Sequence, residues 1–168
     1  MTLTHEIYTD LYDAIKSTDG DLLSKSYTNL KKLSLIYAVA KNDKKEKLYF
    51  SIDQDDIDNV PRFKGLEVSR VRLYEYSKMD FYCELSPKNS ADREMFEVII
   101  EDIRKTTDDA STNIQLFNRV SNVLLKWRNF FAQEKSLLLS SERQQGLYGE
   151  LLLLRRLINW KGIGAVNY

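Results

Sequence analysis

The sequence is poor in the residues on which many catalytic and structural sites depend. Of its 168 residues, one is a cysteine, Cys83, and one is a histidine, His5. A single cysteine excludes a disulfide framework and a cysteine-rich zinc site, and a single histidine excludes a metal site built on a histidine pair. The sequence also lacks a glycine-rich phosphate loop and a Gly-x-Ser-x-Gly elbow, so it carries no signal of a nucleotide-binding P-loop or of an α/β-hydrolase.

Long apolar runs are absent as well. The longest apolar cluster, residues 151–154, covers one helical turn, far short of a membrane-spanning segment. Charged side chains interrupt residues 1–16, which therefore have no apolar core of the kind that signal peptides carry. These absences predict a soluble, cytoplasmic protein with no membrane partner.

The charges balance over the whole chain but not along it. Lys plus Arg number 25 and Asp plus Glu number 25, which disfavours a globally basic nucleic-acid binder. Residues 119–168 hold eight basic and three acidic side chains, a net charge of +5, so the first 118 residues carry −5. The basic part could face the acidic part or a polyanion, and ordinary solvated helix faces would explain the same charges.

Periodicity predicts a helix followed by a sheet. Apolar residues recur every four positions over residues 3–15, which is typical of an amphipathic helix. Two strand–turn–strand pairs follow, residues 33–40 with 48–52 and residues 66–74 with 81–85. Their short connections favour an antiparallel sheet of about four strands, because parallel pairs need long crossovers.

The second half of the sequence predicts three helices. The first is expected to begin at an N-cap, Ser90, and to carry a favourable pair between Glu101 and Lys105. The second has its apolar stripe within residues 114–131. The third begins at a capping box formed by Ser141 and Gln144.

The predicted fold class is therefore α+β. An N-terminal helix and an antiparallel sheet of about four strands occupy residues 1–88, and a helical unit of three helices occupies residues 89–168. The hydrophobic fraction of 43% suffices for one core and leaves room for a small second one, and an aromatic fraction of 11% argues against disorder.

The last predicted helix contains an unusual arrangement. Gly146 and Gly149 each cost roughly 1 kcal/mol relative to alanine inside a helix, and their spacing puts them on one face, where another backbone could approach closely. Glu150 follows directly, beside the apolar stripe, and its i+4 neighbour is Leu154. A carboxylate in that position needs a metal, a base or a buried donor, unless it lies at the edge of the stripe and reaches solvent.

The segment RQQGLYGELLLLR, residues 143–155, resembles the hallmark "RGLFGELLLLR" segment of the bacterial PD-(D/E)XK motif proteins, a branch of the restriction-endonuclease-like superfamily. Upstream, residues 61–68 (PRFKGLEV) are similar to that family's "pGLrGLxV" strand entry. Residues 96–102 are similar to its "LFexvxxDl" helix, and Trp127 matches its "rWrxfl" helix. The resemblance extends over residues 33–168.

The resemblance implies metal-dependent cleavage of DNA. In this superfamily a helix glutamate, a sheet aspartate and a Glu-x-Lys pair together hold a divalent metal, for which Mg²⁺ suits the oxygen ligands, and activate water. The resemblance places Glu150 at the helix glutamate, as the candidate catalytic residue, with Gly146 and Gly149 as the structural motif around it. The later Asp and Glu-x-Lys would lie after Tyr168, so the metal site of this chain is expected to be incomplete. Mg²⁺ is then expected for full-length members only.

By this resemblance the chain is expected to be the amino-terminal fragment of a nuclease of bacterial restriction or defence systems, inactive alone. Its implied partners are DNA, through the full-length protein, and restriction or defence subunits. The alternative is a non-catalytic adaptor that docks partner subunits through the acidic sheet unit, and a third hypothesis is a stand-alone fragment with no activity. Because Tyr148, Leu152 and Leu153 make the last helix apolar on nearly all sides, self-association through it is also expected.

Other candidate residues favour structural roles. Alternating acids at Asp53, Asp55, Asp56 and Asp58 suggest a calcium loop, but the glycine and closing glutamate are missing, which favours a solvated loop. Cys83 is expected to be a small core residue and His5 to face solvent. Eight tyrosines could stack bases, although their spacing favours core and rim positions: Tyr8, Tyr12, Tyr27, Tyr37, Tyr49, Tyr74, Tyr76 and Tyr82.

Overall fold

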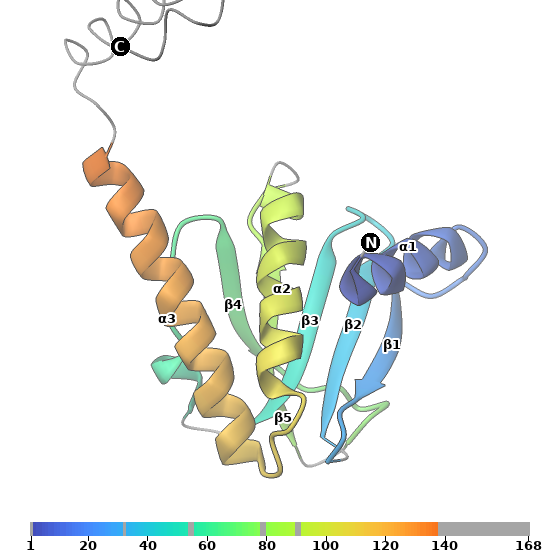
Figure 1. Cartoon of the computed structure of the whole chain (residues 1–168). Helices are drawn as coiled ribbons and strands as arrows, with labels where there is room; N and C mark the ends of the chain where they lie inside the picture. Colours follow the sequence, from blue (N-terminus) through green and yellow to red (C-terminus); the bar gives the residue numbers. More distant parts are fainter. Residues whose placement is uncertain (1, 32, 54–55, 78–79, 90–91, 138–168) are drawn as a thin grey trace, which may run out of the picture. The chain divides into compact units, whose positions relative to one another are not determined.

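The computed structural model describes residues 2–31, 33–53, 56–77, 80–89 and 92–137 (Figure 1). They form, in chain order, α1 (Leu3–Ile15), β1 (Leu22–Thr28), β2 (Ser34–Ala40), β3 (Glu46–Ile52), the 3-10 helix η1 (Asp56–Asn59), β4 (Leu66–Val71), β5 (Phe81–Pro87), α2 (Arg93–Thr107) and α3 (Asn113–Leu137). One compact unit spans Met1–Phe131, and the other, Ala132–Tyr168, lies mostly outside the described residues.

The five strands form one antiparallel sheet in the order β1-β2-β3-β5-β4. The two predicted strand pairs are confirmed as the β2–β3 and β4–β5 hairpins, and the predicted α+β class is confirmed with them. The sheet has one strand more than predicted. The additional strand, β1, lies at the sheet edge, where its residues are exposed or half-buried and its apolar alternation is weak.

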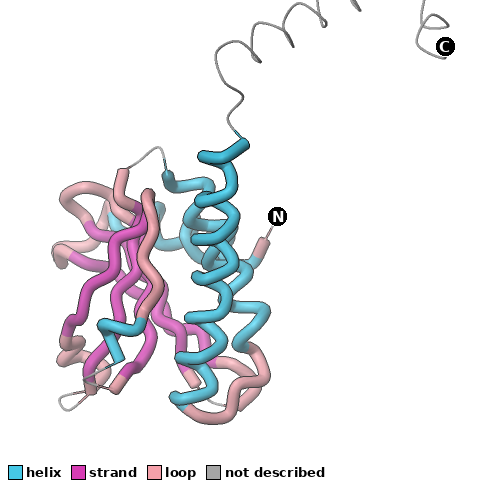
Figure 2. Tube along the Cα trace, turned by 90° about the vertical axis from the view of Figure 1, so that its left-hand side faces the viewer, coloured by secondary structure: helices cyan, strands magenta, loops and turns pink. Residues whose placement is uncertain are grey.

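The helices cover one face of the sheet, as Figure 2 shows from the side. Alternate strand residues point toward them, among them Leu35, Tyr37, Val39, Leu48, Phe50, Ile52, Cys83 and Leu85. The helices contribute matching apolar stripes, which include Ile7, Leu11, Phe96, Ile99, Ile103, Val120 and Leu124. Helix α1 is further anchored by Tyr8, whose ring meets Tyr37 edge-on at a centroid distance of 5.4 Å.

The opposite face of the sheet carries a second, smaller apolar cluster. Ile36, Ala38, Tyr49 and Tyr82 point to this side, and Val71 and Leu73 pack against them. Leu73 belongs to the connection between β4 and β5, so that connection turns across the face that the helices leave uncovered. Both faces of the central strands are therefore buried, which explains why β2 reads as a continuous apolar run.

Helix α2 begins later than the sequence suggests. Its N-cap position is Asp92, whose side chain makes no capping hydrogen bond, whereas Ser90 was the predicted cap and lies outside the described residues. The predicted pair within this helix is confirmed, since Lys105 Nζ lies 3.5 Å from Glu101 Oε1.

Residues on both sides of the predicted boundary at 88 and 89 contribute to one core, and the boundary itself stays a prediction. Among the described residues, no helix combines the length and apolar character that crossing a membrane requires.

Candidate functional site

The residues that the sequence singles out for catalysis lie outside the described part of the chain. This holds for Glu150, for Gly146 and Gly149, and for the capping box before them. Among the described residues, no group of three or more His, Cys, Asp or Glu side chains could hold a metal ion. The described unit buries two charged side chains, Glu46 and Glu101.

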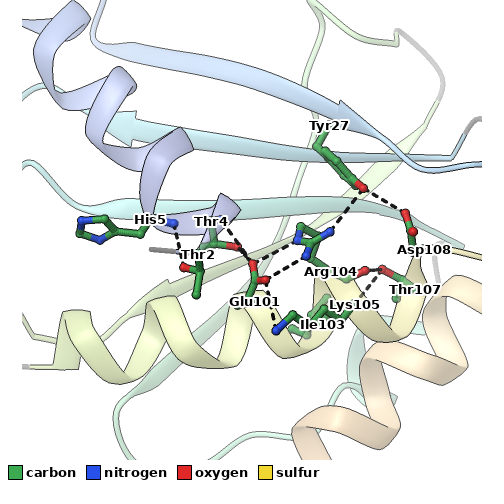
Figure 3. Close-up of polar contacts among 10 residues, drawn as sticks. All are labelled: Thr2, Thr4, His5, Tyr27, Glu101, Ile103, Arg104, Lys105, Thr107 and Asp108. Carbon is green, nitrogen blue, oxygen red and sulfur yellow. Dashed lines mark hydrogen bonds and ion pairs between the residues drawn. The ribbon is translucent and has the colours of Figure 1, made fainter.

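Glu101 on α2 is buried and completely paired (Figure 3). Arg104 donates to both of its carboxylate oxygens, from Nε at 3.0 Å and from Nη2 at 2.9 Å. Thr4 of α1 adds its hydroxyl at 2.7 Å and its backbone N–H at 3.3 Å. These hydrogen bonds, with that from Arg104 first, lower the pKa of Glu101 to about 2.

The same network reaches the edge of the sheet. Arg104 Nη1 donates to the Tyr27 hydroxyl on β1 at 3.4 Å, and that hydroxyl donates to Asp108 Oδ1 at 3.0 Å (Figure 3). Arg104 also lies over the Tyr27 ring, 5.6 Å from its centroid. Since every charge here has a partner, we assign the Glu101 network to holding α1, α2 and β1 together.

Glu46, the first residue of β3, is buried without such compensation. Its side chain has no exposed surface, and its ion-pair partner, Arg93, brings Nε to 2.7 Å from Oε1. Neither carboxylate oxygen accepts an aligned hydrogen bond from any group among the described residues. Burial raises the pKa of Glu46 to about 7; Arg93 opposes the shift and Glu97 adds to it.

Further charges surround this pair. The Arg93 guanidinium lies over the Tyr12 ring at 4.2 Å and also approaches Glu97 Oε1 at 3.3 Å. Glu97 Oε2 is in turn 2.7 Å from Nδ1 of His5, whose side chain is 42% exposed. His5, expected to face solvent, thus stands half-exposed at the end of a row of charges that links α1, α2 and β3.

A cavity of about 530 Å³ opens beside Glu46. Its lining includes Tyr12, Lys44, Lys45, Glu46, Lys88 and Arg93. A buried carboxylate that titrates near neutral pH can accept or donate a proton, and such groups gather at functional sites. Three lysines outnumber Asp43 at the rim, and this excess of cations favours an anionic ligand. We call this arrangement the Glu46 cavity. No sequence pattern indicates this cavity, because a glutamate at the start of a strand is ordinarily a solvated residue.

The structure also locates Cys83 and part of the acidic cluster. Cys83 has no exposed surface, and burial raises the pKa of its thiol to about 12, so it is the inert core residue that was predicted. Of the acidic cluster, Asp56 and Asp58 lie in η1, and Asp55 lies outside the described residues.

Three upstream segments singled out in the sequence meet in the structure. Phe63, from residues 61–68, stacks on Phe131 of α3 at a centroid distance of 5.5 Å. Trp127 Nε1 donates to Oδ2 of Asp102, the last residue of the 96–102 segment, at 3.3 Å. These segments therefore form the contact between α2, α3 and the entry to β4.

Comparison with known proteins identifies a family. Residues 5–167 match the model of a family described as "Putative PD-(D/E)XK family member, (DUF4420)". No curated protein and no solved structure matches the chain.

Proposed function

The chain belongs to this PD-(D/E)XK family, and we propose that it functions in a metal-dependent DNA endonuclease of bacterial restriction or defence systems, in the cytoplasm. The observation that carries the proposal is the extent of the family match, which covers residues 5–167 and so includes nearly all of the described unit as well as Glu150. Glu150 is the candidate catalytic carboxylate. No carboxylate set of the described residues fits Mg²⁺, so we assign them no step of cleavage.

The described unit then serves as a recognition or docking module of that nuclease. Lys44 and Lys88 are exposed at the rim of the Glu46 cavity, where they support contact with DNA phosphates. The net charge of −5 on the first 118 residues favours a second candidate, an adaptor that docks basic partner subunits.

Cleavage by the product of the whole reading frame that encodes this chain tests the first function. We expect it to nick or linearise supercoiled plasmid with Mg²⁺ and to stop in EDTA. Glu150→Gln should abolish cleavage, and Glu142→Gln, a nearby acid outside the motif, should leave it intact. A folded product that neither binds nor cleaves DNA, and that instead co-purifies with a basic subunit, would favour the adaptor.

The recognition role has its own test on the chain itself. Replacing Lys44 and Lys88 together by Gln should weaken DNA binding and reduce the slope of log affinity against log salt by about 2, since each phosphate contact contributes about 0.9. Lys31→Gln, an exposed lysine away from the cavity, is the matched control. An unchanged slope in the double variant would exclude this rim as a DNA contact.

A further inference from the structure

A second hollow lies on the sheet face opposite the helices, between the β4–β5 connection and strands β1 to β3. We call it the tyrosine recess. Its volume is about 310 Å³, at the lower end of the range for small-ligand pockets. The floor is apolar, with Ile36, Tyr49 and Leu73, and the β4–β5 connection adds Arg72, Tyr74 and Tyr76.

Apolar surface left open to solvent gathers at this recess. Tyr74 is 68% exposed, Tyr76 is 40% exposed, and Leu22, which also lines the recess, is 39% exposed. Single exposed apolar residues need no explanation, whereas several around one hollow indicate a binding surface. Aromatic rings serve well in such places because they offer a large stacking area at low entropic cost.

The recess is held in shape by polar and cation–π contacts. The Tyr76 hydroxyl and Ser24 Oγ on β1 are hydrogen-bonded at 2.8 Å, which ties the β4–β5 connection to the far edge of the sheet. Arg72 lies over the Phe81 ring at 4.4 Å from its centroid, and Arg70 lies over the same ring at 5.1 Å. The Phe81 ring thus holds Arg72 beside the recess, whereas Arg70, which pairs with Cys83, lies on the face of the sheet that the helices cover.

We propose that the tyrosine recess takes one unstacked base of a nucleic-acid strand, which stacks on Tyr74 or Tyr76 while Arg72 contacts a neighbouring phosphate. Aromatic faces beside cationic groups are the combination with which proteins bind single strands, because every base has a face that stacks. A purely apolar peptide side chain would offer the Arg72 guanidinium at the recess no anionic partner, whereas a phosphate does. The inference rests on the proposed function, which supplies DNA as the ligand.

Binding of a fluorescein-labelled single strand of about 15 nucleotides to the chain, followed by anisotropy, tests the proposal. Tyr74→Ala should weaken binding by about 10-fold, because it removes a stacking face, and Tyr74→Phe should keep most of the affinity. Phe130→Ala is the matched control, since Phe130 is a 54% exposed aromatic residue of α3 outside the recess.

Two further measurements separate the base contact from the phosphate contacts. An abasic strand of the same length keeps every phosphate but has no base to stack. It should bind about 10-fold more weakly than the normal strand, and Tyr74→Ala should not weaken its binding further. Arg72→Gln should reduce the slope of log affinity against log salt by about 0.7, whereas Tyr74→Ala should leave that slope unchanged.

Equal binding of the normal and abasic strands would overturn the base pocket, and so would equal effects of Tyr74→Ala and Phe130→Ala. Failure to bind either strand would overturn it too. These results differ from failure of the proposed function, which appears as a lack of Mg²⁺-dependent plasmid cleavage by the product of the whole reading frame.

Discussion

Arg93 and Glu46 form an ion pair whose two members differ sharply in their contact with water. The Nε–Oε1 distance is 2.7 Å, yet the Glu46 side chain has no exposed surface while that of Arg93 is 42% exposed. The solvated cation therefore compensates only part of the cost of burying the anion. Because burial prevails, the protonation of Glu46 is coupled to folding.

The first prediction concerns Glu46→Gln and pH. The folded-state pKa of about 7 exceeds the ordinary value of 4.5. Between pH 4.5 and pH 7, Glu46 therefore keeps its proton in the folded protein and loses it in the unfolded chain. The stability that this proton contributes is complete below pH 4.5 and is lost as the pH rises through 7. As the pH rises from 5 to 8, the wild type should therefore lose stability that Glu46→Gln keeps. The free energy of unfolding of Glu46→Gln, relative to that of the wild type, should rise by up to about 3 kcal/mol.

Urea denaturation of both proteins at the two pH values measures that shift. Glu94→Gln, which removes an exposed acid of α2, is the control and should differ from the wild type equally at both. A difference between Glu46→Gln and the wild type that does not change with pH would contradict the buried, protonated carboxyl.

The second prediction concerns Glu101, whose pKa is shifted in the opposite direction from that of Glu46. Hydrogen bonds from Arg104 and Thr4 lower its pKa from 4.5 to about 2, so its contribution to stability is present above pH 4.5 and is lost as the pH falls toward 2. Glu101→Gln should lower the free energy of unfolding by about 3 kcal/mol at pH 7. Denaturation curves between pH 7 and pH 3 should show this deficit shrinking, and a deficit that persists undiminished at pH 3 would argue against ionic pairing as its cause.

The third prediction concerns Gly65→Ala. Gly65 has a backbone φ of +95°, which residues with a side chain rarely adopt. A Cβ at this position would also lie 3.0 Å from Met95 Cε. We expect a loss of about 1–2 kcal/mol in the free energy of unfolding, by thermal or urea denaturation. Gly20→Ala is the control: its Cβ would meet its nearest neighbour at 3.7 Å, so it should be close to neutral. Equal effects of the two variants would contradict a conformational role for Gly65.

Patterns with strong periodicity allowed much of the fold to be predicted. The stripe of residues 3–15 and the apolar runs of β2, β3 and β5 depend on burial, which the sequence records directly. Strand β1 was not predicted because it lies at the sheet edge, where a strand needs no alternation of apolar residues. The cap of α2 was misplaced because Ser90 and Asp92 are both good capping residues.

The sites were harder to predict than the fold. Glu46 gains its raised pKa from α1 and α2, which meet it only in three dimensions, and no local pattern encodes that burial. The exposure of Tyr74 and Tyr76 likewise depends on the path of the β4–β5 connection across the sheet. The resemblance pointed instead to Glu150, whose neighbourhood lies outside the described residues.

The last prediction is that the chain as given does not cleave DNA. Glu150 is the helix carboxylate that the family resemblance implies, and residues 151–168 contain no Asp or Glu to join it. A single carboxylate does not hold Mg²⁺ in a geometry that activates water, because that ion requires several oxygen ligands around it. Supercoiled plasmid incubated with the chain and Mg²⁺ should therefore remain supercoiled on an agarose gel. Cleavage that disappears in Glu150→Ala and persists in Glu142→Ala would show that the chain assembles a complete metal site from residues other than those implied by the resemblance.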